Sequence, residues 1–209
     1  MLTLHHLETS RSSRIIWLLE ALGIDYELVT HQRNEQRRAP PELKAVHPLG
    51  KAPTIVDGDL VLTESATILR YIATRYGEGR FMPAPGTTAA ALHDEWLDYA
   101  ESSLMMPLMF NLMGRMGGGL PDALQRFAGP ELDKALDYIA AGVGEGRFLM
   151  GDDLTLADMQ MSYCMAMAEA GGFLAPRPAL AAYWERLQDH PGFRRAVEVG
   201  GPLMMIPGR

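Results

Sequence analysis

The chain has 209 residues, 47% of them hydrophobic and 22% charged, with a formal net charge of −7. This composition allows a sizeable hydrophobic core and excludes an intrinsically disordered chain, while the negative charge argues against nucleic acid as a partner. No apolar run is long enough to cross a bilayer and no signal peptide is evident, so we expect a cytoplasmic protein without membrane contact.

Residues 1–78 alternate short strand-like runs with helical runs. In chain order they predict strand 2–7, helix 15–22, strand 26–31, helix 41–46, hairpin strands 54–56 and 60–62, and a helix that opens at Glu64-Ser65. The hairpin is indicated by its turn, Asp57-Gly58-Asp59. The order βαβαββα predicts a small mixed sheet, because a strand–helix–strand unit is parallel and a hairpin is antiparallel.

The second part of the chain shows only helical periodicity. Residues 79–86 carry two prolines and two glycines, a composition that suits a linker. Further on, Thr155 to Asp158 form a capping box in its Asp form, which predicts the start of a helix. We therefore predict an α/β domain over 1–78 and an all-α domain over 87–209.

The stretch from Lys51 to Ser65 presents several backbone groups to one ligand. An X-Pro bond such as Ala52-Pro53 tolerates the cis form far better than any other peptide bond, and a cis turn would expose the preceding N–H and C=O groups. The helix start at Ser65 offers unpaired N–H groups to an anion. This arrangement favours a small peptide-like acid, although Pro53 could equally begin an edge strand and Ser65 could cap a helix.

The whole pattern resembles the cytosolic glutathione transferases. The motifs that carry the resemblance are the turn Ser10-Arg11-Ser12-Ser13-Arg14, the Lys51-Ala52-Pro53 loop, the Glu64-Ser65 helix start and the Thr155 to Asp158 capping box. The segment APPELKAVHPLGKAP is similar to a serine-type group found in bacteria and fungi. The resemblance implies a thioredoxin-like N-terminal domain that binds glutathione and a helical C-terminal domain that lines a pocket for an electrophile.

The resemblance also implies roles for five residues of this chain. Pro53 would be the cis-proline, and Ala52 would pair its backbone with the cysteinyl part of glutathione. Glu64 and Ser65 would hold the γ-glutamyl end, and Lys51 would lie near the glycyl carboxylate. Glutathione is then a cosubstrate, and we expect neither a permanently bound cofactor nor a metal.

The thiol of glutathione must be ionised to react, so the site needs a group that stabilises the thiolate. The family uses Tyr, Ser or Cys at the end of the first strand. Here the first tyrosine is Tyr26 and the single cysteine is Cys164, so the choice falls on the serine turn. Ser10 best matches the family serine, Ser12 is the second candidate and Thr9 the third, with helix capping as the alternative role for these side chains.

We therefore predict a homodimeric glutathione transferase in which a serine hydroxyl activates the thiolate for attack on small apolar electrophiles, with reduction of organic hydroperoxides as a side activity. The methionine-rich run 104–116 suggests Met105, Met109 and Met113 for the electrophile pocket, although core or dimer packing is an equal reading. The alternative functions are a non-catalytic regulatory or scaffold protein of the same fold and a dedicated glutathione-dependent isomerase or dehalogenase.

Overall fold

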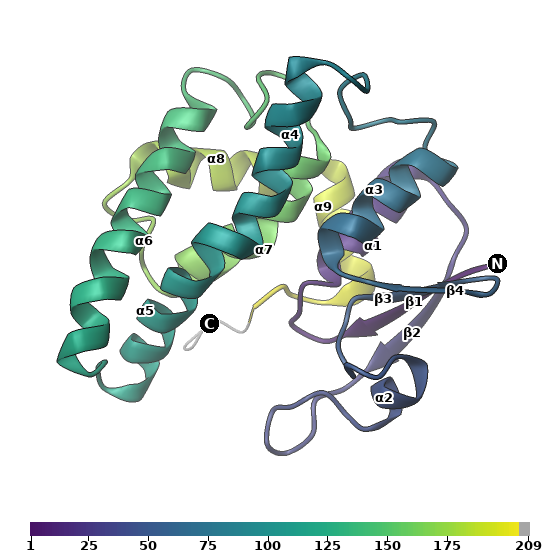
Figure 1. Ribbon diagram of the computed structural model, residues 1–209, viewed down its shortest axis with the longest axis horizontal. Helices are drawn as coiled ribbons and strands as arrows, with labels where there is room; N and C mark the ends of the chain where they lie inside the picture. Colours follow the sequence, from purple (N-terminus) through teal and green to yellow (C-terminus); the bar gives the residue numbers. More distant parts are fainter. Residues whose placement is uncertain (205–209) are drawn as a thin grey trace. The chain divides into compact units, whose positions relative to one another are not determined.

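The computed structural model describes residues 1–204, which form two compact units (Figure 1). The N-terminal unit comprises Met1–Arg80 and the segment that begins at Asp189, and the helical unit comprises Phe81–Gln188. Within residues 1–204, no helix combines the length and the apolar character that crossing a membrane requires.

The N-terminal unit contains a four-stranded mixed sheet in the order β2-β1-β3-β4. β1 pairs in parallel with β2 and antiparallel with β3, and β3 pairs antiparallel with β4. The predicted mixed sheet and its closing hairpin are therefore present, with the hairpin turn at Gly58 and Asp59. The strand bounds are β1 Leu2–Leu7, β2 Glu27–His31, β3 Thr54–Asp57 and β4 Leu60–Thr63.

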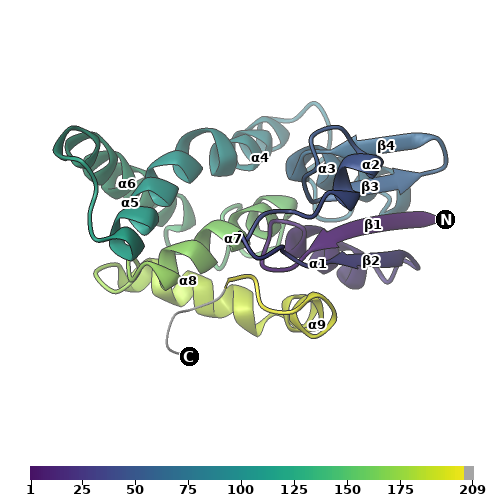
Figure 2. The same cartoon turned by 90° about the horizontal axis from the view of Figure 1, so that it is seen from below.

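Helices cover both faces of this sheet. Figures 1 and 2 agree that α1 and α3 lie on one face and α2 on the other. Side chains of β1 alternate accordingly, since Leu2, Leu4 and His6 are buried whereas Thr3 and His5 are half-buried. The helix bounds are α1 Ser13–Leu22, α2 Glu42–Val46 and α3 Ser65–Tyr76.

The last helix, α9 (Pro191–Gly200), packs on α1 and belongs to the N-terminal unit. Its contact is aromatic, because the ring of Trp17 lies edge-on to Phe193 with ring centroids 5.2 Å apart. Gly192 permits this approach, since a Cβ there would lie 2.9 Å from the indole nitrogen of Trp17. The contact unit thus differs from the predicted domain range 87–209, which assigned α9 to the helical part.

The helical unit is built around α7, whose residues Leu156–Ala168 are all buried. The predicted capping box opens this helix, with the backbone N–H of Thr155 donating to Oδ2 of Asp158 at 2.9 Å. Asp158 also accepts hydrogen bonds from the N–H of Leu149 and the hydroxyl of Tyr183. The remaining bounds are α4 Thr88–Tyr99, η1 Ala100–Leu104, α5 Met105–Gly117, α6 Asp122–Val143, α7 Leu156–Ala170 and α8 Pro178–Asp189.

A π-helical turn, η1, joins α4 to α5 without a break. Pro107 explains it, because proline has no N–H for the carbonyl of Ser103 and its ring would clash with that carbonyl in a regular α-helix. A π turn relieves the clash by adding a residue to the local helical turn. The sequence analysis predicted helices here without this irregularity.

Candidate functional site

The C-terminal end of β1 and the beginning of β3 lie side by side at one end of the two central strands of the sheet. His5 pairs with Thr54 in the antiparallel ladder, so the Ala52-Pro53 segment continues beside the end of β1. The serine turn follows β1 directly and leads into α1. Pairing of these strands therefore brings two predicted motifs that are far apart in the sequence, the serine turn and the Lys51-Ala52-Pro53 loop, to the same end of the sheet.

The serine turn is tied together by its own hydroxyl groups. Oγ of Ser10 lies 2.6 Å from Oγ of Ser12 and accepts the backbone N–H of Ser12 at 3.2 Å. Ser10 is 7% exposed, whereas Ser12 is fully buried at 0%. Thr9 has a positive φ of 50°, and its hydroxyl oxygen accepts a hydrogen bond from Arg33. Of the three candidate hydroxyls, that of Ser12 is thus the least accessible to a ligand.

His6 stands behind this turn on the buried face of β1. Its Nδ1 lies 2.7 Å from Oγ of Ser12, and its Nε2 lies 2.8 Å from the carbonyl oxygen of Gly200 at the end of α9. Burial lowers the pKa of His6 below 6.5, against the raising effects of the Gly200 carbonyl and of Glu8. Burial therefore favours the neutral form of the His6 imidazole over the charged form.

The start of α3 is linked to the start of α1 by a buried hydrogen bond. Nη1 of Arg14, which is 0% exposed, donates to Oγ of Ser65 at 3.0 Å. Glu64 precedes Ser65 with φ 68° and ψ 113°, a conformation that residues other than glycine rarely adopt. Its side chain is exposed. The helix start thus presents a carboxylate, a hydroxyl and free N–H groups together.

The loop before β3 has the predicted cis peptide bond between Ala52 and Pro53. The hydroxyl of Thr54 donates to the carbonyl of Lys51 at 2.8 Å, which closes the turn. Because the sheet ladder begins at Thr54, the peptide groups of Ala52 lie outside it. The side chain of Lys51 is exposed.

The three methionines predicted for an electrophile pocket differ in burial along α5. Met105 is 4% exposed and packs in the helical unit, whereas Met109 and Met113 are 41% and 60% exposed. Among residues 1–204, no group of three or more His, Cys, Asp or Glu side chains could hold a metal ion.

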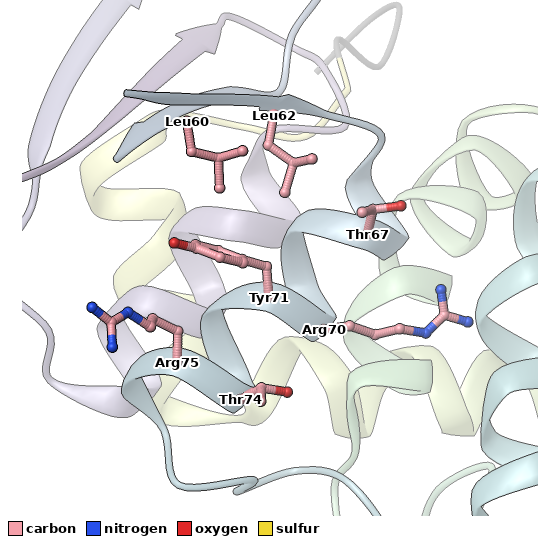
Figure 3. Close-up of a pocket in the computed structure, with 7 residues that line it drawn as sticks. All are labelled: Leu60, Leu62, Thr67, Arg70, Tyr71, Thr74 and Arg75. Atoms are coloured by element: carbon pink, nitrogen blue, oxygen red, sulfur yellow. The ribbon is translucent and has the colours of Figure 1, made fainter. Parts of the chain in front are cut away.

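An apolar hollow of about 670 Å³ lies between β4 and α3 (Figure 3). Leu60 and Leu62 hang over Tyr71, while Arg70 and Arg75 point outward on either side. It contains none of the residues predicted to bind glutathione. Its lining residues are Leu60, Leu62, Thr67, Arg70, Tyr71, Thr74 and Arg75.

Comparison with known proteins identifies the family. Residues 1–74 match the family model of the glutathione S-transferase N-terminal domain, and residues 121–195 match that of the C-terminal domain. Glutathione S-transferase 3 of Zea mays is 34% identical over 194 residues, which cover 88% of this chain and 87% of the relative. The chain belongs to the glutathione S-transferase family. A second glutathione S-transferase 3, from Schizosaccharomyces pombe, is 30% identical over 95% of this chain and 87% of its own length.

A solved structure of the glutathione S-transferase family has the same fold. The crystal structure of a glutathione S-transferase from Actinobacillus pleuropneumoniae has a TM-score of 0.88 at 37% identity, and the match covers 97% of this chain and 94% of that one. The predicted fold class, a thioredoxin-like α/β domain followed by helices, is therefore confirmed. The predicted enzyme class is confirmed at the level of the family.

The sequence did not predict a role in the site for two buried residues of this glutathione S-transferase family member, His6 and Arg14. His6 shares the buried strand face with Leu2 and Leu4. Arg14 was used only to locate the serine turn. A polar residue within an otherwise apolar buried face was the available signal in both cases.

Proposed function

We propose that this protein is a serine-type glutathione transferase, in which Ser10 donates a hydrogen bond to the thiolate of glutathione. The thiolate attacks an electrophilic carbon, a C–S bond forms, and the leaving group departs from that carbon. One observation carries the proposal. In a chain of this family, the serine turn and the cis-Pro53 loop lie at the same end of the two central strands.

Glutathione itself fits the groups at this end of the sheet. The peptide groups of Ala52 outside the sheet ladder suit the cysteinyl backbone, as an added strand would. The hydroxyl and N–H of Ser65 suit the γ-glutamyl carboxylate, and Glu64 suits the γ-glutamyl ammonium. We assign Lys51 to the glycyl carboxylate because its exposed ammonium group lies beside Ala52 in the chain.

Accessibility favours Ser10 over the other hydroxyls of the turn. Ser12 is 0% exposed, and the hydroxyl oxygen of Thr9 is held by Arg33. Ser10 retains some exposure and sits at the end of β1, beside the proposed place of the cysteinyl group. A hydroxyl donor together with the N-terminus of α1 stabilises an anion over a neutral thiol.

The experiment is titration of the protein with glutathione, followed by the ultraviolet absorbance of the thiolate and by conjugation of a general aryl halide electrophile. We expect a bound thiol that is ionised at neutral pH, where the free thiol with its pKa of about 8.5 is not. Ser10→Ala should lose thiolate and conjugation, whereas Thr30→Ala on the exposed side of β2 should lose neither. Absence of binding at millimolar glutathione would overturn the proposal.

The same titration separates the alternative functions. Bound thiolate without conjugation of any electrophile would favour a regulatory protein or a dedicated isomerase or dehalogenase. Turnover of an organic hydroperoxide, with two glutathione molecules oxidised to the disulfide per peroxide reduced to alcohol and water, would establish the side activity.

Met105, Met109 and Met113 remain proposed contacts of the electrophile. Alanine variants at these positions should then change the KM for the electrophile but not the KM for glutathione.

We propose in addition that the protein works in the cytoplasm, where reduced glutathione is available. We also propose that two copies of the chain associate through the hollow of Figure 3. β4 is an edge strand, and Leu60, which lines the hollow, is 37% exposed, so a second copy would cover apolar surface there. Leu60→Asp should convert a dimer to a monomer by light scattering. Phe127→Asp, at an exposed apolar position on α6, is the matched control.

A further inference from the structure

Three side chains form an unbroken hydrogen-bonded line inside the N-terminal unit, from Ser10 through Ser12 to His6. The two Oγ atoms are 2.6 Å apart, and Oγ of Ser12 is 2.7 Å from Nδ1 of His6. Ser12 and His6 are 0% and 1% exposed, so solvent does not compete for these bonds. Only Ser10, at the open end of the line, is partly exposed.

The direction of this line is set by the end of α9. The carbonyl oxygen of Gly200 can only accept a hydrogen bond, so Nε2 of His6 carries a proton. The neutral ring then has a bare Nδ1, which accepts the hydroxyl proton of Ser12. That hydroxyl does not point instead to Oγ of Ser10 or to the carbonyl of Leu7, because a bare Nδ1 and a bare hydroxyl oxygen 2.7 Å apart would repel. The hydroxyl of Ser10 must therefore donate to Ser12, and its own oxygen accepts from an incoming thiol.

The arrangement changes when the thiol is ionised. Ser10 can donate to a thiolate only if another proton lies between the two serine oxygens, because two lone pairs 2.6 Å apart repel. That proton comes from Ser12, and Ser12 can supply it only if Nδ1 of His6 donates to Ser12 in turn. Thiolate at Ser10 and a doubly protonated ring at His6 thus belong to the same state of the line.

We propose that His6 is the terminal acceptor of the glutathione thiol proton, received through Ser12 and Ser10, an inference that rests on the proposed function. The S–H bond breaks and its proton goes to Oγ of Ser10. Ser10 passes its own proton to Ser12, and Ser12 passes its own to Nδ1, where an N–H bond forms. The products are a thiolate facing the hydroxyl of Ser10 and an imidazolium facing the carbonyl of Gly200, with no proton gained or lost.

The surroundings of His6 contain groups that favour this charge and groups that oppose it. The C-terminal end of α9 carries partial negative charge, and Glu8 adds a full negative charge, so both favour the imidazolium. Burial and the neighbouring His31 on β2 oppose it, which keeps the ring neutral before glutathione arrives. The thiolate supplies a second negative charge at the other end of the line, and it is this charge that shifts the balance.

The test compares the pKa of the bound thiol in variants that each remove one member of the hydrogen-bonded line. His6→Asn keeps an oxygen that accepts from Ser12 but removes the base, and Ser12→Ala removes the middle of the line. Both should raise the pKa of the bound thiol by at least about one unit, so that about tenfold less thiolate is present at neutral pH. His5→Asn, on the opposite face of the same strand, should leave it unchanged.

Binding of S-methylglutathione reports on the site without the thiol, and we expect wild-type affinity in both line variants. In the wild-type protein, NMR of the His6 ring should show the imidazolium on addition of glutathione and the neutral ring with S-methylglutathione. A neutral ring beside a bound thiolate, or an unchanged thiol pKa in His6→Asn, would overturn the inference alone. A wild-type protein that binds no glutathione would overturn the proposed function and the inference with it.

Discussion

Nη1 of Arg14 and Oγ of Ser65 are joined by a buried hydrogen bond of 3.0 Å that ties the first turn of α1 to the first turn of α3. Because the guanidinium donates to the hydroxyl oxygen, the hydroxyl proton of Ser65 is left for another acceptor. That acceptor is the proposed γ-glutamyl carboxylate. If Ser65 binds glutathione as proposed, this contact couples the stability of the N-terminal unit to its affinity for glutathione.

Ser65→Ala should weaken both properties. It removes an acceptor from the buried Nη1 of Arg14, so the free energy of unfolding should fall by about 1–3 kcal/mol. The dissociation constant for glutathione should rise, because the carboxylate loses a donor. Urea unfolding and calorimetric titration measure the two effects. Ser65→Thr, which retains the hydroxyl, should recover most of both, and an alanine variant with wild-type affinity would contradict the role of Ser65.

Asp158→Asn should strongly destabilise the helical unit. One carboxylate oxygen accepts from the N–H and hydroxyl of Thr155, and the other accepts from Leu149 and Tyr183. An amide has a single oxygen, so two buried donors lose their acceptor at about 1–3 kcal/mol each. Thermal unfolding measures the loss. Tyr183→Phe removes only one of the four donors and should cost clearly less; equal losses in the two variants would refute this account.

Gly142→Ala should be destabilising although alanine is the better helix former. A Cβ at this position of α6 would overlap the indole ring of Trp96, and overpacking of this kind costs about 1–3 kcal/mol. Gly117→Ala at the end of α5 meets no atom within 4 Å, so it should be neutral or raise stability by up to about 1 kcal/mol. Urea unfolding of both variants checks the contrast, which fails if Gly142→Ala is as stable as the wild type.

Stability should fall with acidification below pH 6.5. Burial lowers the pKa of His5, His6 and His190 from the ordinary value of 6.5, so the folded protein binds their protons less readily than the unfolded chain. Their contribution to stability is complete above pH 6.5 and is lost as the pH falls toward the folded pKa values. Unfolding free energies measured across this range should show a shallower slope in His6→Asn, and an identical slope would contradict the assignment.

Local patterns predicted much of the fold. The Asp57-Gly58-Asp59 turn, the helix start at Ser65 and the Thr155 to Asp158 capping box each depend on neighbouring residues, and each lies where the sequence indicated. The π turn η1 also has a local cause in Pro107, yet helical periodicity does not distinguish it from an α-helix.

Long-range contacts could not be predicted in this way. The hydrogen bond between His6 and Gly200 joins residues 194 positions apart, and only the packing of α9 on α1 brings them together. Burial along α5 is a second case, because a run rich in methionine does not tell which of Met105, Met109 and Met113 will face the core. Motifs that depend on neighbouring residues could thus be located in the sequence, whereas the partners that packing brings to them, such as Gly200 beside His6, could not.

The docking of α9 on α1 has a consequence for how the chain is made. During synthesis the strands and helices of residues 1–80 leave the ribosome before the segment that completes their unit, which begins at Asp189. Until Gly200 has emerged, Nε2 of His6 lacks its carbonyl partner, and the apolar face of Trp17 lacks Phe193. The N-terminal unit therefore remains incomplete until α9 has been synthesised, and only then can His6 make both of its hydrogen bonds, to Ser12 and to Gly200.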